Sequence, residues 1–145
     1  MNMHEYADNR NEFSTLVGWL DHGNHAFRRA CVSADAYSGL VNVRDGGLYV
    51  IYGHLAVCRC GANTGFTHRV RRRTLKAVEV ITVLEDSSAA SAQAGDDDCH
   101  GEPLFASDLF GLVTLEDGDS VWIDAKPASA VYRPNGASFF GLYRL

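Results

Sequence analysis

Residues 47–58, GLYVIYGHLAVC, constrain the fold more than any other part of the chain. The segment is rich in aromatic and β-branched residues, which is typical of a β-strand. Side chains of a strand alternate between its two faces, so Leu48, Val50, Tyr52, His54 and Ala56 share one face, and Tyr49, Ile51, Gly53, Leu55 and Val57 share the other. Both faces are mostly apolar, whereas a strand of an antiparallel sandwich usually has one polar face. One face is therefore expected to meet the core of the domain, and the other a second apolar surface.

Residues 138–145, SFFGLYRL, repeat this pattern at the end of the sequence. As a strand, this segment places Phe140 and Leu142 on one face and Phe139, Tyr143 and Leu145 on the other. Two strands of this kind make a second hydrophobic surface that is too large to leave in water. Self-association is the simplest way to cover it.

The remaining sequence favours further short strands over helices. Strand patterns occur at 39–44, 66–73, 76–84, 109–115 and 120–125, with turn signals such as DGG and EDGD between them. No long stretch has apolar residues at helical spacing. The small, polar segment 87–98 indicates a loop, and residues 1–11 indicate an N-terminal tail. The chain is therefore predicted to be one all-β domain over residues 12–145, an antiparallel sandwich or barrel.

Composition narrows the classes of partner and compartment. The formal net charge of −5 argues against nucleic acid as the main partner, and no apolar run approaches the ~20 residues of a membrane span. The start of the sequence lacks the apolar segment of a secretory signal, so the chain is expected to be either cytosolic or a piece of a longer precursor. The four cysteines, Cys31, Cys58, Cys60 and Cys99, allow three complete pairings if the protein is exported, and are expected to be thiols in the cytosol.

No pattern in the sequence points to catalysis or to a cofactor. A metal enzyme of the cupin type needs a His-x-His pair, which does not occur, and neither a Ser-His-Asp pattern nor paired carboxylates stand out. A zinc site at Cys58 and Cys60 with His54, Cys99 and His100 is conceivable, but the cysteine spacing is not the C-x₂-C of zinc ribbons. We therefore expect neither an enzyme nor a metal or other cofactor.

Four segments carry a resemblance to a known family. GGLYVIYGHLAVC resembles the central strand of tumour necrosis factor superfamily ligands, and LVTLEDGDSVWID resembles the hairpin near their C-terminus. SFFGLYRL resembles their terminal strand, and LVGWLDHGNHAF resembles the early segment with its Trp. The four occur in the family's order from Leu16 to Leu145, which covers about nine-tenths of the chain.

The resemblance implies a ten-stranded antiparallel jelly-roll β-sandwich that assembles as a homotrimer. The trimer-interface positions that carry over are Leu48, Val50, Tyr52, His54, Phe110, Leu112, Phe139, Tyr143 and Leu145. Where many ligands have an interface Tyr, this sequence has Asp108, and Phe110 or Leu112 is expected to supply the lost packing. For His54, a hydrogen-bonded neutral side chain is favoured over a pH switch.

The same resemblance implies a partner, namely the cysteine-rich ectodomain of a receptor of the tumour necrosis factor receptor superfamily. The expected contact regions are 21–29, 71–76 and 126–137, and the candidate residues in the last two are Arg71, Arg72, Arg73, Val131, Tyr132 and Arg133. The basic run at 68–76 has two other interpretations, an ordinary solvated strand face and a patch for an anionic surface.

The resemblance also implies a disulfide, a location and a function. Cys58 is expected to pair with Cys99, with Cys60 as the competing partner, while Cys31 is expected to be a buried free thiol. The expected location is extracellular, as the ectodomain of a single-pass type II membrane protein that some family members shed, with an N-terminal anchor absent from this chain. The expected function is that of a cytokine that clusters receptors in immune regulation. The alternative is another extracellular trimeric module, similar to the globular heads of complement.

Overall fold

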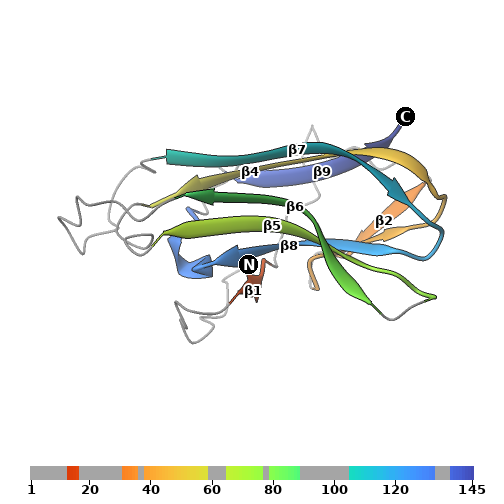
Figure 1. Ribbon diagram of the computed structural model, residues 1–145, viewed down its shortest axis with the longest axis horizontal. Coiled ribbons are helices and arrows are strands. Elements are labelled where there is room, and N and C mark those ends of the chain that lie inside the picture. The colour runs from red at the N-terminus through yellow and green to blue at the C-terminus, as the bar shows by residue number, and fades with distance from the viewer. Residues whose placement is uncertain are drawn as a thin grey trace.

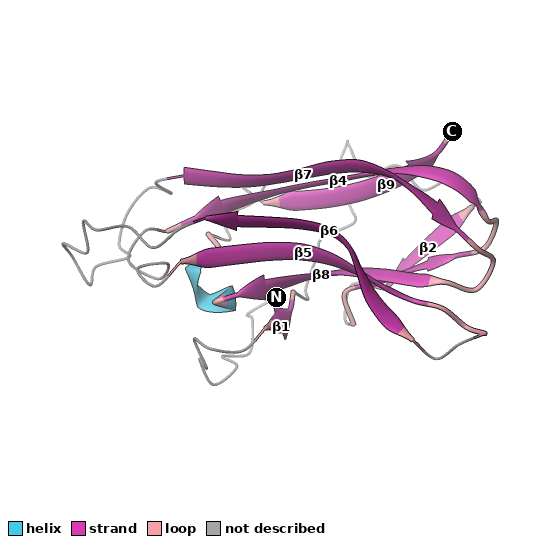
Figure 2. Ribbon diagram, in the orientation of Figure 1, coloured by secondary structure: helices cyan, strands magenta, loops and turns pink. Residues whose placement is uncertain are grey.

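The computed structural model describes residues 13–16, 31–35, 38–58, 65–76, 79–88, 105–132 and 138–145. These residues form nine strands and one short 3₁₀ helix (Figure 1 and Figure 2). The elements are β1 (Ser14–Thr15), β2 (Val32–Asp35), β3 (Leu40–Val43), β4 (Gly47–Val57), β5 (Phe66–Arg73), β6 (Val80–Ser88), β7 (Phe105–Leu115), β8 (Ser120–Lys126), η2 (Ala128–Ala130) and β9 (Phe139–Arg144). The predicted tail at 1–11 lies outside the described residues.

The strands form two sheets that face each other. One has the order β2-β3-β8-β5-β6, with β1 also paired to β8, and the other has the order β7-β4-β9. Every pairing between these strands is antiparallel. Several neighbours, such as β3 and β8 or β4 and β9, come from distant parts of the chain, as in a jelly roll. Figure 1 shows β7, β4 and β9 in one layer and β5 and β8 in the other. The predicted all-β antiparallel jelly roll is confirmed.

β1 and β2 were not expected from the sequence, and two expected strands have clearly different bounds. β6 begins at Val80 rather than at residue 76 and continues to Ser88, two residues into the predicted loop. β7 begins at Phe105, four residues before the expected start. Pairing with a neighbouring strand extends β6 to Ser88 and β7 back to Phe105, because Phe66 of β5 lies opposite Ser88 and Val57 of β4 lies opposite Phe105. The ladder hydrogen bonds therefore outweigh the poor strand propensity of the polar residues that they include.

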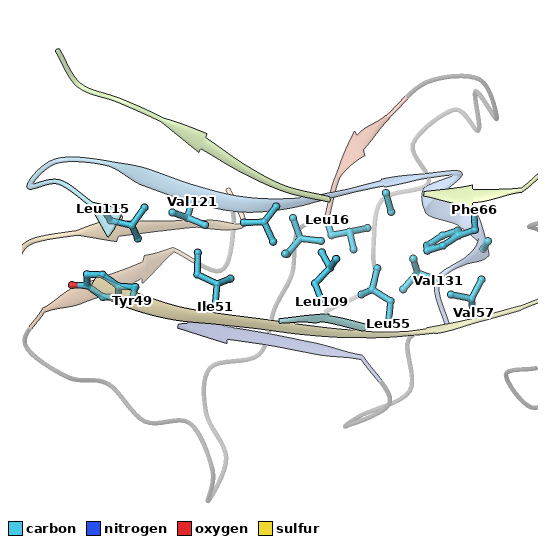
Figure 3. Packing of buried hydrophobic residues seen from close by; sticks show 14 of the residues in the cluster. Leu16, Tyr49, Ile51, Leu55, Val57, Phe66, Leu109, Leu115, Val121 and Val131 are labelled. Carbon is cyan, nitrogen blue, oxygen red and sulfur yellow. The ribbon is translucent and has the colours of Figure 1, made fainter. Parts of the chain in front are cut away.

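The core lies between the two sheets. The inward face of β4 supplies Tyr49, Ile51, Leu55 and Val57, all of which are fully buried. Figure 3 shows them packed against side chains of the opposite layer, among them Val121 of β8. The expectation that one face of this strand meets the core is confirmed.

Candidate functional site

The outer face of the β7-β4-β9 sheet is the candidate site, because it is apolar and lies on the side away from the core. The register of the three strands sets its side chains in three rows: Leu112–Val50–Tyr143, Phe110–Tyr52–Gly141 and Asp108–His54–Phe139. Leu48 and Leu145 continue the face at one end, where the Leu145 N–H donates to the Leu48 carbonyl oxygen. We call these eleven residues the apolar face.

Exposure marks the apolar face as unusual. Of the ten large hydrophobic side chains exposed among the described residues, seven belong to it: Leu48, Tyr52, Phe110, Leu112, Phe139, Tyr143 and Leu145. Phe110 is 73% exposed, although its neighbour across the sheet, Tyr52, is also aromatic. Val50 is only 4% exposed, because Leu112 and Tyr143 flank it on the two adjacent strands. A contiguous apolar surface of this kind on a folded domain marks an interaction site.

Aromatic rings occupy the middle of the apolar face. The centroid of the Tyr52 ring lies 6.4 Å from that of Phe139 and 6.5 Å from that of Tyr143. Tyr52 lies across β9 directly over Gly141, where an added Cβ would overlap the phenol ring. The glycine of the SFFGLYRL segment therefore makes room for Tyr52 to lie flat on the sheet.

One polar pair lies within the apolar face. His54 Nδ1 and Asp108 Oδ1 are 2.6 Å apart, joining β4 to β7. The other side of the imidazole is covered by Phe139, whose ring centroid is 5.1 Å away with an interplanar angle of 16°. The pair was not expected from the sequence, although Asp108 stood out as the residue in place of an interface Tyr. Alternation within each strand gives only the face on which a residue lies, whereas the cross-strand register brings Asp108 beside His54.

The model of the TNF (Tumour Necrosis Factor) family matches residues 17–145. The chain belongs to the tumour necrosis factor family. A search among curated proteins finds no match. The family is one of cytokines, its domains are usually extracellular, and its members in general form trimers and bind receptors.

The basic residues expected at a receptor contact of this tumour necrosis factor family member are not equivalent. The Arg72 guanidinium donates from Nε at 2.7 Å and from its terminal nitrogen at 2.6 Å to Asp119 Oδ2. Asp119 is 1% exposed and also accepts from the Glu116 N–H, so Arg72 holds the turn between β7 and β8 in place. Arg71 donates to Thr82 Oγ1 at 2.7 Å, while Arg73 is exposed.

The candidate receptor-contact residues after η2 also differ in exposure. Val131 is buried in the core and pairs with Val57 through an isolated bridge, so its side chain does not face a partner, contrary to expectation (Figure 3). Tyr132 is half-buried, and its backbone N–H donates to the Ala56 carbonyl at 2.7 Å. Arg133 and the region 21–29 lie outside the described residues.

The structure does not show the disulfide expected at Cys58, which is a free thiol. Its side chain is buried at the end of β4, and burial raises the pKa of the thiol. A buried protonated thiol packs as a small apolar group and needs no bridge. Cys60 and Cys99, the competing pair, lie outside the described residues. Cys31 is free, as predicted, but half-buried rather than buried.

No helix among the described residues is long and apolar enough to cross a membrane. Within the same part of the chain, no group of three or more His, Cys, Asp or Glu residues could hold a metal ion. Of the zinc ligands considered from the sequence, Cys60, Cys99 and His100 lie outside it.

A buried polar network that sequence reasoning missed lies behind the apolar face. His68 of β5 points into the sandwich, and its Nδ1 lies 3.2 Å from Ser107 Oγ of β7. The Ser107 hydroxyl donates to Asp86 Oδ2 at 2.6 Å, so the His68 Nδ1–H is the donor to Ser107. His68 Nε2 is buried with no hydrogen-bond partner among the described residues. Desolvation lowers the pKa of His68 to about 4, an effect that the nearby Asp86 partly opposes. His68 is therefore neutral at pH 7.

Proposed function

We propose that this chain is an extracellular cytokine ligand that assembles as a homotrimer through the apolar face. The trimer would bind and cluster cysteine-rich receptors of the tumour necrosis factor receptor superfamily in immune regulation, without catalysing a reaction. In its natural setting, the domain would be the ectodomain of a single-pass type II membrane protein. The observation that carries this proposal is the apolar face itself, which needs a cover in water.

The two outer faces of the sandwich differ in polarity, which favours self-association through only one of them. The outer face of β5 and β8 is charged: Arg69 donates to Asp124 Oδ2 at 3.2 and 3.0 Å, and its guanidinium lies 3.4 Å from the centroid of the Phe13 ring. That face is suited to water. The apolar face on the other sheet is not, so copies of the chain would meet through it and turn their charged faces outward.

Receptor binding would use surfaces repeated once per protomer. In a three-fold assembly, the concave surfaces lie between neighbouring protomers. Arg73 and Leu75 are exposed at the end of the β5–β6 hairpin, and Tyr132 is half-buried after η2. We propose these three as contact residues. Arg71, Arg72 and Val131 would act by supporting the backbone beneath them, and Arg133 adjoins Tyr132 in sequence.

The test of assembly is Tyr143→Asp, which puts a carboxylate in the middle of the apolar face. Three such charges buried without partners would oppose assembly. Light scattering should give the mass of three chains for the unsubstituted protein and of one chain for the variant, with unchanged circular dichroism. Leu75→Asp is the control, because Leu75 is also a large exposed hydrophobic side chain but lies off the apolar face. A Tyr143→Asp protein that keeps the mass of the unsubstituted assembly would overturn the proposed interface.

The test of receptor binding is surface-plasmon kinetics against a panel of receptor ectodomains from the superfamily. For the receptor that binds, Tyr132→Ala should speed dissociation, at a cost of about 2 kcal/mol. Arg73→Glu should slow association instead, and the effect should be larger at low salt. If no receptor of the panel binds the trimer, or if both variants bind like the parent protein, the proposed receptor contact is wrong.

A further inference from the structure

The His54–Asp108 pair places ionisable groups on a surface that is otherwise apolar. In the single chain, water reaches both groups, since the His54 side chain is 32% exposed and the Asp108 side chain 68%. The row next to them, Phe110–Tyr52–Gly141, is at the centre of the apolar face. A partner that covers this face would remove water from the carboxylate as well.

The charge balance around the pair is simple. On the apolar face, β7 contributes only Asp108, β4 contributes only His54, and β9 contributes aromatic residues and glycine but no charge. Tyr52 and Tyr143 add phenol hydroxyls to this face. Behind the sheet, His68 is the nearest titratable group from β5, and it is neutral above about pH 4. Asp86 of β6 lies beyond Ser107, whose hydroxyl it binds. Among the described side chains of the apolar face, the His54–Asp108 pair therefore carries the charge.

The charge depends on whether His54 carries one proton or two. With a neutral imidazole, the pair has a net charge of −1, because the Nδ1–H donates to a carboxylate that nothing else neutralises. With an imidazolium, the pair is a salt bridge of net charge zero. Moving an uncompensated carboxylate out of water costs more than moving a neutral pair. The imidazolium form is therefore the form that a covered apolar face favours.

We propose that self-assembly of this chain takes up protons at His54, so that the assembly is stronger at pH 6.5 than at pH 8. The inference rests on the proposed self-contact through the apolar face, and it adds a regulator to that contact. Thermodynamic linkage requires that a proton bound on assembly makes the association constant depend on pH. Because each protomer has one His54, the uptake is at most one proton for each protomer.

The experiment is a dilution series followed by fluorescence-detected sedimentation at pH 6.5, 7.0, 7.5 and 8.0. For the unsubstituted chain, the association constant per protomer should rise by up to about tenfold for each pH unit lowered. Asp108→Asn keeps the size and a hydrogen-bond acceptor but has no charge, so its association should no longer strengthen as the pH falls and should be tighter than that of the parent at pH 8. His54→Asn keeps an N–H donor for Asp108 but cannot be protonated, so its association should be independent of pH and weak throughout. His68→Asn is the control, and it should keep the pH dependence of the parent.

A second measurement applies even if the assembly does not dissociate on dilution. The ring signals of His54 in NMR should change at a higher pH in the assembled chain than in the Tyr143→Asp monomer. Self-association with the same strength from pH 6.5 to 8, or a pH dependence that persists in Asp108→Asn, would overturn the proton-coupled assembly and leave the self-contact intact. Absence of self-association at every pH, in the parent and in Asp108→Asn alike, would overturn both.

Discussion

Mild acid should destabilise the fold through His68. The side chain is fully buried, and desolvation lowers its pKa from 6.5 to about 4. Between these two pH values the unfolded chain binds the proton and the folded chain does not, so the free energy of unfolding falls as the pH falls through this window. The difference between the two pKa values corresponds to a loss of about 3 kcal/mol in the free energy of unfolding over the full pH range. About 2 kcal/mol of this loss falls between pH 7 and pH 5.

Urea unfolding of the unsubstituted chain and of His68→Asn at pH 7, 6 and 5 measures this loss. The Asn amide can replace Nδ1–H as the donor to Ser107 and does not titrate, at the cost of a small cavity. Both proteins share the same carboxylates and the same apolar face, so comparing them at one protein concentration removes those contributions. The stability advantage of the parent should shrink by about 2 kcal/mol from pH 7 to pH 5. A constant difference over this range would refute the account of His68 as a buried group that stays neutral.

Two further substitutions test residues that hold other parts of the structure in place. Arg72→Ala leaves the buried Asp119 carboxylate without its guanidinium and should lower the free energy of unfolding in urea by about 3–5 kcal/mol. The control Arg73→Ala should lower it by less than about 0.5 kcal/mol, and equal losses would contradict a supporting role for Arg72. Gly141→Ala should displace the exposed Tyr52 ring and weaken self-association at least tenfold in sedimentation, while the free energy of unfolding changes by less than about 1 kcal/mol. Unimpaired association would show that the position of the ring is unimportant.

The sequence predicted the strands best where hydrophobic pattern and pairing agree. Residues 66–73 match β5, and 47–57 match β4, because alternation and β-branched residues mark both. The four-residue strand β2 (VSAD) and the polar ends of β6 and β7 were missed, since neighbouring strands impose them. Propensity read along a single segment does not contain that information.

The same limit applied to the site. Alternation along β4 and β9 identified the apolar face, and the structure shows the exposed rings of Tyr52 and Tyr143 there. Alternation did not reveal that Asp108 lies next to His54, because the sequence of one strand does not show its register with the neighbouring strand. For Arg72 the pattern was available but not used: it follows His68 and Val70 at a spacing of two, and so faces inward.

The place of β9 in the chain has a consequence for biosynthesis. β9 pairs with β4, although about 80 residues separate them in sequence. β4 leaves the ribosome well before Phe139, Gly141 and Tyr143 of β9 have been made. Until then the apolar face lacks its third strand, so two neighbouring nascent chains on one message could not join through the complete face. If copies join through this face, each chain would have to add β9 to its own sheet first, so assembly would follow folding of the sandwich.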